Sequence, residues 1–244
     1  MKKFILLVFV SVLMLGCVTT GQNDTQSGDI ATNESMNIKA LDRAEMVSPT
    51  ENEDARRAYN LGTFYLTENR LAEAEKLLKE AIDLDPVFVD AMDHLGIVYR
   101  RQNRLDEAEK IYLKSIELND KNKVPFINLA VVYQIQGRLN DAFNLYTHVV
   151  QILPDDPEGY YGIGELYYMT NNYENSLLFF DKAIELYIRK NSPYVYDAFY
   201  YKGMIYYEMN KLDEALKYLE EAQKGNPNNE TLKRTIDEIR NKKV

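Results

Sequence analysis

Five small residues recur at a nearly constant interval along this chain, and the period restricts the fold more than any other feature. The intervals between them are 34, 34, 34 and 39 residues. A tyrosine stands three residues after every one of them, and an alanine or serine follows each tyrosine after nine more. The five small residues are Gly62, Gly96, Ala130, Gly164 and Gly203. Such a period indicates a stacked array of similar units, because one unit cannot bury its apolar face alone.

Each unit also carries large and small residues at helical spacing. A large side chain comes four residues after the alanine or serine, and a smaller one comes seven residues after it. The large residues are Leu78, Tyr112, Tyr146, Phe180 and Leu219. This spacing predicts two helices per unit that cross closely, with the large residue of the second helix beside the small residue of the first.

Together these positions resemble the tetratricopeptide repeat, and the resemblance covers residues 55–229. It implies an all-α fold, an α-solenoid of five helix–turn–helix repeats, each with a helix A and a helix B. The repeats span residues 55–88, 89–122, 123–156, 157–190 and 196–229. Residues 230–241 continue the helical period and predict a capping helix, whose polar outer face keeps the end of a solenoid soluble.

Turn and capping residues predict where the helices begin and end. Thr50 and Glu53 have the spacing of a capping box that begins the first helix. Five extra residues separate repeats four and five, where Ser192 is a good N-cap and Pro193 suits a first helical turn. We therefore expect longer helices at this junction. The A–B turns contain residues that tolerate a left-handed backbone, namely Asn69, Asn103, Gly137, Asn171 and Asn210.

The first sixteen residues have the layout of a signal peptide. Two lysines precede an apolar stretch, residues 4–15, which is shorter than the roughly 20 residues that span a bilayer. Residues 13–17 resemble the lipobox of bacterial lipoproteins, although Met14 and Leu15 depart from its common pattern. The resemblance implies cleavage before Cys17 and attachment of a diacylglyceryl group to its thiol. An ordinary secretory peptide and an uncleaved anchor are the alternatives.

The segment after the cysteine is polar and has few apolar side chains. Residues 17–49 are therefore expected to form a disordered tether between the lipidated Cys17 and a solenoid at residues 50–241, because such a segment cannot offset its ordering entropy. Val18 is not the aspartate that retains some lipoproteins at the inner membrane. The periplasmic face of the outer membrane of a bacterial cell envelope is therefore the favoured location.

Charge and composition exclude several classes of function. The formal net charge of −9 argues against a nucleic-acid partner, because binding to phosphates requires basic surface. Two histidines in different repeats and one cysteine give no metal-ligand spacing. No pairing of a nucleophile with a base is visible. We expect no catalysis, no cofactor, no metal and no small-molecule substrate.

The resemblance implies that helix A residues line a concave groove in which partners bind. The expected groove residues are Tyr59, Asp93, Ile97, Ile127, Val131, Tyr161, Glu165, Tyr168, Tyr200, Met204 and Tyr207. Residues 157–229 hold 13 of the 19 tyrosines, which favours an aromatic groove in repeats four and five. The alternative is that these tyrosines pack between successive A helices. His94 is expected to face the groove as a solvated side chain.

The charges of the groove predict the chemistry of its ligand. Some members of the family grip a C-terminal carboxylate, but only Asn128 fits the residues that such a clamp needs. Acidic residues are expected along the groove instead, at Asp90, Asp93, Glu158, Glu165 and Asp197. The predicted ligand is therefore a protein or peptide with apolar anchors and some basic residues.

Two functions fit this layout, which resembles that of repeat-containing lipoproteins of the bacterial outer membrane. The first is a membrane-anchored scaffold or adaptor in an envelope assembly process, as in pilotin-type factors. The alternative is a regulatory adaptor that positions a cell-wall hydrolase or another enzyme on its substrate. Architecture alone does not choose between them.

Overall fold

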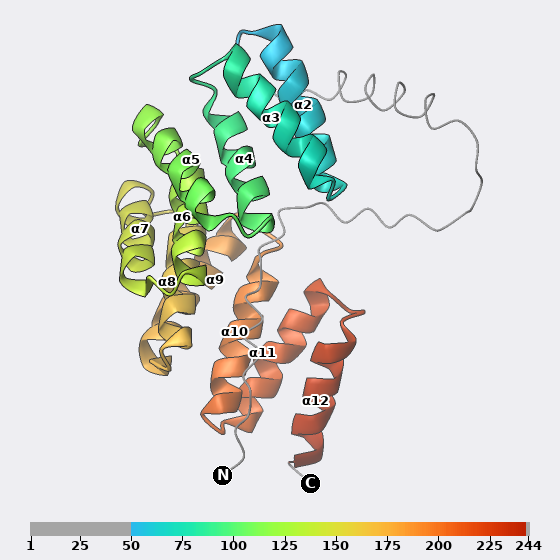
Figure 1. Cartoon of the computed structure of the whole chain (residues 1–244). Coiled ribbons are helices and arrows are strands. Elements are labelled where there is room, and N and C mark those ends of the chain that lie inside the picture. Colours follow the sequence, from blue (N-terminus) through green and yellow to red (C-terminus); the bar gives the residue numbers. More distant parts are fainter. Residues whose placement is uncertain (1–49, 243–244) are drawn as a thin grey trace, which may run out of the picture.

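A computed structural model of the chain describes residues 50–242, which form eleven α-helices and no strand (Figure 1). The helices are α2 (Glu53–Thr67), α3 (Leu71–Leu84), α4 (Val89–Arg101), α5 (Leu105–Leu118), α6 (Lys123–Ile135), α7 (Leu139–Ile152), α8 (Pro157–Met169), α9 (Tyr173–Arg189), α10 (Val195–Glu208), α11 (Leu212–Gly225) and α12 (Glu230–Lys242). None of these helices has the length and apolar character needed to cross a bilayer.

The helices alternate between two layers of a curved array. Helices α2, α4, α6, α8 and α10 are the A helices, and α3, α5, α7, α9 and α11 are the B helices. Each A helix contacts the next A helix, whereas within residues 50–242 no B helix contacts the next B helix. The array therefore curves toward the A helices, whose outer surface we call the A face (Figure 1). The predicted solenoid of five helix pairs with a capping helix, α12, is confirmed.

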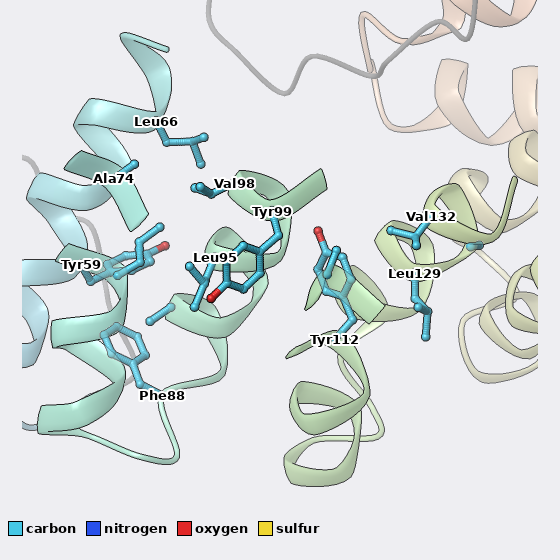
Figure 2. Packing of buried hydrophobic residues seen from close by; sticks show 14 of the residues in the cluster. Tyr59, Leu66, Ala74, Phe88, Leu95, Val98, Tyr99, Tyr112, Leu129 and Val132 are labelled. Atoms are coloured by element: carbon cyan, nitrogen blue, oxygen red, sulfur yellow. The ribbon is translucent and has the colours of Figure 1, made fainter. Parts of the chain in front are cut away.

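The A and B helices of one repeat cross where the sequence places its small residues. A Cβ atom added to Gly96 would lie 2.4 Å from the ring of Tyr112. The same addition to Gly62 would lie 2.9 Å from Cγ of Leu78. Figure 2 shows the Tyr112 ring between the side chains of α4 and those of α6. The predicted pairing of small and large residues is therefore how each repeat closes.

Left-handed residues end the A helices, as predicted. Gly137 has a φ of +75°, and the four predicted asparagines have φ between +57° and +60°. One further left-handed residue, which the turn pattern did not predict, is Asn191, with a φ of +50° after α9. Helix α9 has 17 residues, against 14 in α3, α5 and α7, so the expectation of longer helices at this junction is confirmed for α9. Helix α10 has 14 residues and is shorter than α2, which has 15, so the expectation is wrong for α10.

Two predicted caps are wrong. Asn52, not Thr50, caps α2, because its Oδ1 accepts hydrogen bonds from the N–H groups of Asp54 and Ala55 at 3.0 Å. The Thr50 hydroxyl instead donates to Asp85 Oδ2 at 2.5 Å and so joins the chain to the end of α3.

Ser192 does not cap α10, which begins at Val195. The Ser192 hydroxyl accepts from the N–H of Tyr194 at 3.4 Å, and Tyr194 has a φ of −67° and a ψ of −7°. The serine therefore belongs to a short turn that precedes the helix. This turn includes Pro193 and occupies the place where the first helical turn was expected.

An arginine in the A–B turn couples the first three repeats. The Arg104 guanidinium lies 4.4 Å from the Tyr99 ring centroid and donates to Glu75 of the preceding B helix at 2.7 Å. Arg138 lies 3.8 Å from the Tyr133 ring centroid and pairs with Glu109 at 3.0 Å. We call these contacts the arginine ladder. Each rung combines a cation–π contact with an ion pair across a repeat boundary.

The arginine ladder stops at repeat four. Asn172 stands where the arginine would be, and Phe143 stands where the preceding B helix would supply a glutamate. The Phe143 ring packs edge-on against Tyr167, with 5.9 Å between centroids. Tyr167 also packs on Phe179 at 5.6 Å. Aromatic packing thus takes the place of the arginine rung beside this A–B turn.

A buried carboxylate joins repeat two to repeat three. Asp93 is 2% exposed and accepts from the Ser115 hydroxyl at 2.6 Å and from Asn122 Nδ2 at 3.0 Å. Asn122 also caps α6, since its Oδ1 accepts from the N–H of Val124. Burial raises the pKa of Asp93 from 3.8 to about 7, against the lowering effect of both hydrogen bonds. One side chain thus fixes α4, α5 and the start of α6.

Substituting Gly96→Ala should destabilise the array, because the new methyl group meets the Tyr112 ring. Overpacking of this kind costs about 1–3 kcal/mol, measured as a lower free energy of unfolding in urea. The cost should shrink in a Tyr112→Leu background, where the second helix no longer presents a ring. An equal cost in both backgrounds would contradict this account of the crossing.

Substituting Asp93→Asn should change how stability depends on pH. Because the folded pKa is raised, the folded state keeps a proton that the unfolded chain loses, so the aspartate's contribution falls as pH rises from about 4 to about 7. The stability of the variant relative to the parent should therefore rise across this window, by at most about 1.4 kcal/mol per pH unit. Urea unfolding at pH 4.5, 6 and 8 measures this. A constant difference would argue against a raised pKa.

Candidate functional site

The predicted binding residues belong to the helices of the A face, and the structure divides them into a buried and a surface group. The predictions for residues 1–49, including the signal peptide, Cys17 and the tether, lie outside the described residues. Among the described residues, three of the expected groove residues are buried and eight reach the surface to some degree.

Tyr59, Asp93 and Tyr161 do not line the surface, so the expectation that they do is wrong. They are 8%, 2% and 4% exposed. Tyr59 packs against Phe88 with 4.9 Å between ring centroids, and burial raises its pKa to about 12. Figure 2 shows Tyr59 and Phe88 side by side within the core. The side chain at this position fills the space between one repeat and the next A helix.

Tyr161 occupies the same position in repeat four. Its ring makes edge-on contacts with Phe180 at 5.5 Å and with Tyr201 at 5.9 Å. Tyr201 comes from α10, so the next A helix covers the tyrosine. Packing between successive A helices, the alternative interpretation of these tyrosines, therefore describes Tyr161.

The remaining eight residues lie on the A face. Tyr200 is 39% exposed and the others are half-buried. They are contributed by four successive A helices and comprise Ile97, Ile127, Val131, Glu165, Tyr168, Tyr200, Met204 and Tyr207. Their role in binding stays a prediction, but their positions place apolar and aromatic side chains along one continuous layer of helices.

His94 is not the solvated side chain that was expected. It is half-buried, its Nδ1 lies 2.9 Å from the backbone oxygen of Asp90, and its ring packs edge-on against Tyr59 at 5.2 Å. Burial lowers the pKa of His94, which favours a neutral imidazole. The histidine therefore belongs to the packing between repeats one and two.

Three tyrosines of the A face stand in the C-terminal repeats, and we call Tyr168, Tyr200 and Tyr207 the tyrosine patch. The Tyr168 ring packs edge-on against Tyr201 at 5.5 Å, and partial burial raises the pKa of Tyr168 to about 12. Tyr200 also packs edge-on against Tyr201, at 5.8 Å. Tyr201 thus supports both rings.

The capping helix contributes to this surface, which the repeat pattern did not predict. Lys242 donates a hydrogen bond to the Tyr207 hydroxyl at 2.5 Å, and its Nζ lies 4.8 Å from the centroid of the same ring. Lys242 comes one residue after the predicted end of the cap, and no repeat position corresponds to it. Nothing in the repeat pattern could therefore have assigned it to Tyr207.

The acidic residues expected along the groove have different surroundings. Glu158 and Asp156 both pair with Lys123, at 3.3 and 2.7 Å, so Glu158 is partly neutralised. Asp90 is half-buried and Asp197 is an exposed residue of α10, but desolvation raises the pKa of both carboxyl groups. The acidic character of the A face is therefore less uniform than its sequence suggests.

Among the residues that the structure describes, no group of three His, Cys, Asp or Glu side chains could hold a metal ion.

A buried polar group lies beneath the A helices, and the sequence pattern did not predict it. The Tyr146 hydroxyl donates to Gln134 Oε1 at 2.9 Å. Both Arg100 and Glu165 act electrostatically on this hydroxyl, so side chains from α4, α6 and α8 surround it. The sequence signal that could have revealed this buried hydroxyl is Tyr146 itself, because other repeats have leucine or phenylalanine at this core position.

Three families match parts of the chain. Residues 37–152 match the family described as the middle TPR-like domain of cilia and flagella-associated protein 70. Residues 157–187 and 196–229 match two families described as tetratricopeptide repeat. Among curated protein sequences, none matches this chain.

Several solved structures share this fold. A chain of the APC/C hetero-tetramer Cut9–Hcn1 superposes with a TM-score of 0.72 and 17% identity, over 87% of this chain and 41% of that chain. A thermophilic TPR protein of Thermus thermophilus gives 0.63 and 16%, over 76% and 98%. PilF of Pseudomonas aeruginosa gives 0.62 and 21%, over 72% and 78%.

These similarities agree with the helix pairs, the crossings and the left-handed turns described above. This chain spans less than half of the Cut9–Hcn1 chain that it matches, and the identities are low enough that the likeness concerns the fold alone. The repeat families and the solenoid together show that the chain belongs to the tetratricopeptide-repeat family, whose fold serves as a scaffold for protein–protein interaction.

Proposed function

We propose that this protein is a membrane-anchored adaptor that binds a protein partner on its A face during assembly of the bacterial envelope. The observation that carries the proposal is the tyrosine patch beside the apolar residues of α6 and α10. Tyrosine gives a large amphipathic contact at low cost in side-chain entropy, which makes it a frequent binding residue. Proteins of this family are in general scaffolds without catalysis.

The chemistry of the A face defines the partner's binding segment. Tyr168, Tyr200 and Met204 offer contacts to apolar side chains, because each is at least partly open to solvent. Asp197 and Glu208 are exposed acidic residues on the same helix, α10. A segment with apolar anchors, and with basic residues where it meets α10, would match both features.

The anchor is supported by the sequence at the N-terminus. An apolar stretch that is too short to span the bilayer ends directly before Gly16 and the only cysteine, Cys17. Two acyl chains hold a protein stably on a membrane, whereas one gives only marginal attachment. A lipidated Cys17 on the outer membrane, with residues 18–49 as a tether, would present the solenoid to partners in the periplasm. An adaptor for a cell-wall hydrolase shares this geometry, and the identity of the partner distinguishes the two.

Replacing Tyr168, Tyr200 and Tyr207 by alanine should abolish capture of the partner without unfolding the array, because these rings stand at the surface. The measurement is co-purification of the full chain from detergent-solubilised membranes, with mass spectrometry to name the partner. A matched control replaces Leu113, Leu178 and Ile188, which are exposed on the B helices. Undiminished capture by the tyrosine variant, or equal loss in the control, would refute the role of the patch.

Substituting Cys17→Ser should prevent lipidation and release the protein from the membrane fraction. Growth with labelled palmitate tests this directly, since the label should be incorporated into the parent chain and not into the variant. Label that persists in the variant, or that never enters the parent, would argue against lipidation of Cys17. The N-terminal segment would then be an ordinary secretory peptide or an uncleaved anchor.

A further inference from the structure

The first helix pair leaves apolar side chains uncovered at one end of the array. Leu61 and Phe64 of α2 are half-buried. The residues that correspond to Phe64 in the other repeats are at most 4% exposed, namely Val98, Val132, Leu166 and Ile205. Those that correspond to Leu61 in repeats two to four are also buried, namely Leu95, Leu129 and Ile163. Figure 2 shows Leu95 and Val98 on the side of α4 that faces the first repeat. The preceding repeat therefore covers these two positions.

The opposite end of the array shows how such an edge is closed. Helix α12 follows the last pair and packs against α11 through three buried residues, Leu232, Ile236 and Ile239. The terminal units of a solenoid need a cap of this kind, because their apolar faces have no neighbouring repeat. Within residues 50–242, no helix does the same for α2.

The repeat pattern continues before α2. The three buried residues of α3 are Ala74, Leu78 and Ala81. One 34-residue period earlier the chain also has three apolar residues, namely Ala40, Ala44 and Val47. Their spacing places them on one face of a helix. The pattern of helix A does not continue, because Ala31 stands where each repeat has its tyrosine. The sequence before α2 therefore has the pattern of a helix B without its helix A.

The family match and a proline give this segment its bounds. The match to the middle TPR-like domain begins at residue 37, whereas α2 begins at Glu53. Residue 37 lies one period before Leu71, the first residue of α3. Pro49 would end a helix, because the residue before a proline is disfavoured in helical backbone. Residues 48–52 then connect the segment to α2, as residues 85–88 connect α3 to α4.

Hydrogen bonds hold the start of the described chain at the end of α3. The Thr50 hydroxyl donates to Asp85, and Asn52 Nδ2 donates to the backbone oxygen of Leu84 at 2.9 Å. Thr50 corresponds to Leu84 one period later, so equivalent points of two successive units lie next to each other. The chain thus reaches α2 from the place where a preceding helix B would end.

The side-chain sizes are complementary at the same edge. Between α7 and α8, a Cβ atom on Gly159 would lie 2.9 Å from Cγ2 of Val150 and 3.1 Å from the backbone oxygen of Tyr146. The residues that correspond to these three before and in α2 are Arg57, Ser48 and Ala44. A small residue of α8 thus faces two large ones, whereas the large Arg57 would face two small ones.

We propose that residues 37–47 form a helix that packs on Leu61 and Phe64 and caps the first repeat. Ala40, Ala44 and Val47 face α2. The connection of residues 48–52 is short, so its high effective concentration favours this segment over a second copy of the chain. The tether expected at residues 17–49 then comprises residues 17–36. The proposal does not depend on the function of the A face.

The neighbouring contacts follow from the same register. Leu41 corresponds to Phe143, which packs against Tyr167 at 5.9 Å between ring centroids. Leu41 therefore approaches Tyr65, the tyrosine of repeat one, whose ring also lies 4.3 Å from the Arg70 guanidinium. The first A–B turn is then closed by an apolar contact, as the turn of repeat four is.

Hydrogen exchange of the full chain in detergent, followed by mass spectrometry, tests the cap. Amides of residues 41–47 should exchange at least about tenfold more slowly than those of an unstructured peptide, because a docked helix is open in only a small fraction of molecules. Exchange of this segment at the unstructured rate would overturn the proposal.

Two matched variants test whether the helix docks on α2. Val47→Asp places a charge against the apolar edge, so it should remove the protection of residues 41–47 and speed exchange at residues 61–65. Met46→Asp adds the same charge where the corresponding Glu80 and Lys114 are exposed, so it should change neither. Exchange in α8 should match the parent in both variants, which shows that the array stays folded.

The remaining outcomes count against the cap. Equal effects of Val47→Asp and Met46→Asp would overturn the docking face. Protection of residues 61–65 that survives Val47→Asp but is lost when a dimer dissociates on dilution, as followed by light scattering, would assign the edge to a second copy of the chain and overturn the proposal.

Discussion

The close crossing of helix A over helix B is the contact on which the rest of the structure depends. Where Gly96 meets the Tyr112 ring, no Cβ atom fits between the helices. This contact sets the angle of each pair, and the angle brings successive A helices together while it separates the B helices. The curvature, the A face and every side chain presented on it follow from a glycine or alanine that recurs at a fixed interval.

The sequence predicted what short-range geometry determines. The crossings and the left-handed asparagines were found because each depends on one residue type at one position. The predictions that Thr50 and Ser192 cap helices were wrong because another residue or a turn within two or three positions determines where the helix begins. Helix ends depend on such small differences in local geometry. The N-cap role of Asn52 outweighs the capping-box spacing of Thr50 and Glu53.

The candidate site was harder to predict, because exposure on the A face depends on the following repeat. Tyr59, Tyr161 and Tyr200 share one repeat position but differ in exposure. Residues of the next A helix cover the first two, namely His94 and Tyr201. Tyr200 belongs to α10, and the capping helix α12 that follows contains no aromatic residue to cover it, so Tyr200 is exposed. A single-repeat pattern contains no information about this neighbour.

The change from the arginine ladder to aromatic packing alters how the A–B turns respond to ionic strength. The rungs at Arg104 and Arg138 rest on charges that are partly open to solvent, so salt screens them. The contact between Phe143 and Tyr167 involves no charge, so salt leaves it in place. Ion pairs elsewhere join the same two repeats, such as Lys123 with Glu158 and Arg189 with Asp155, and these are open to screening as well. Concentrated salt would therefore weaken the A–B turn contacts of repeats two and three, while the corresponding turn of repeat four keeps its aromatic contact.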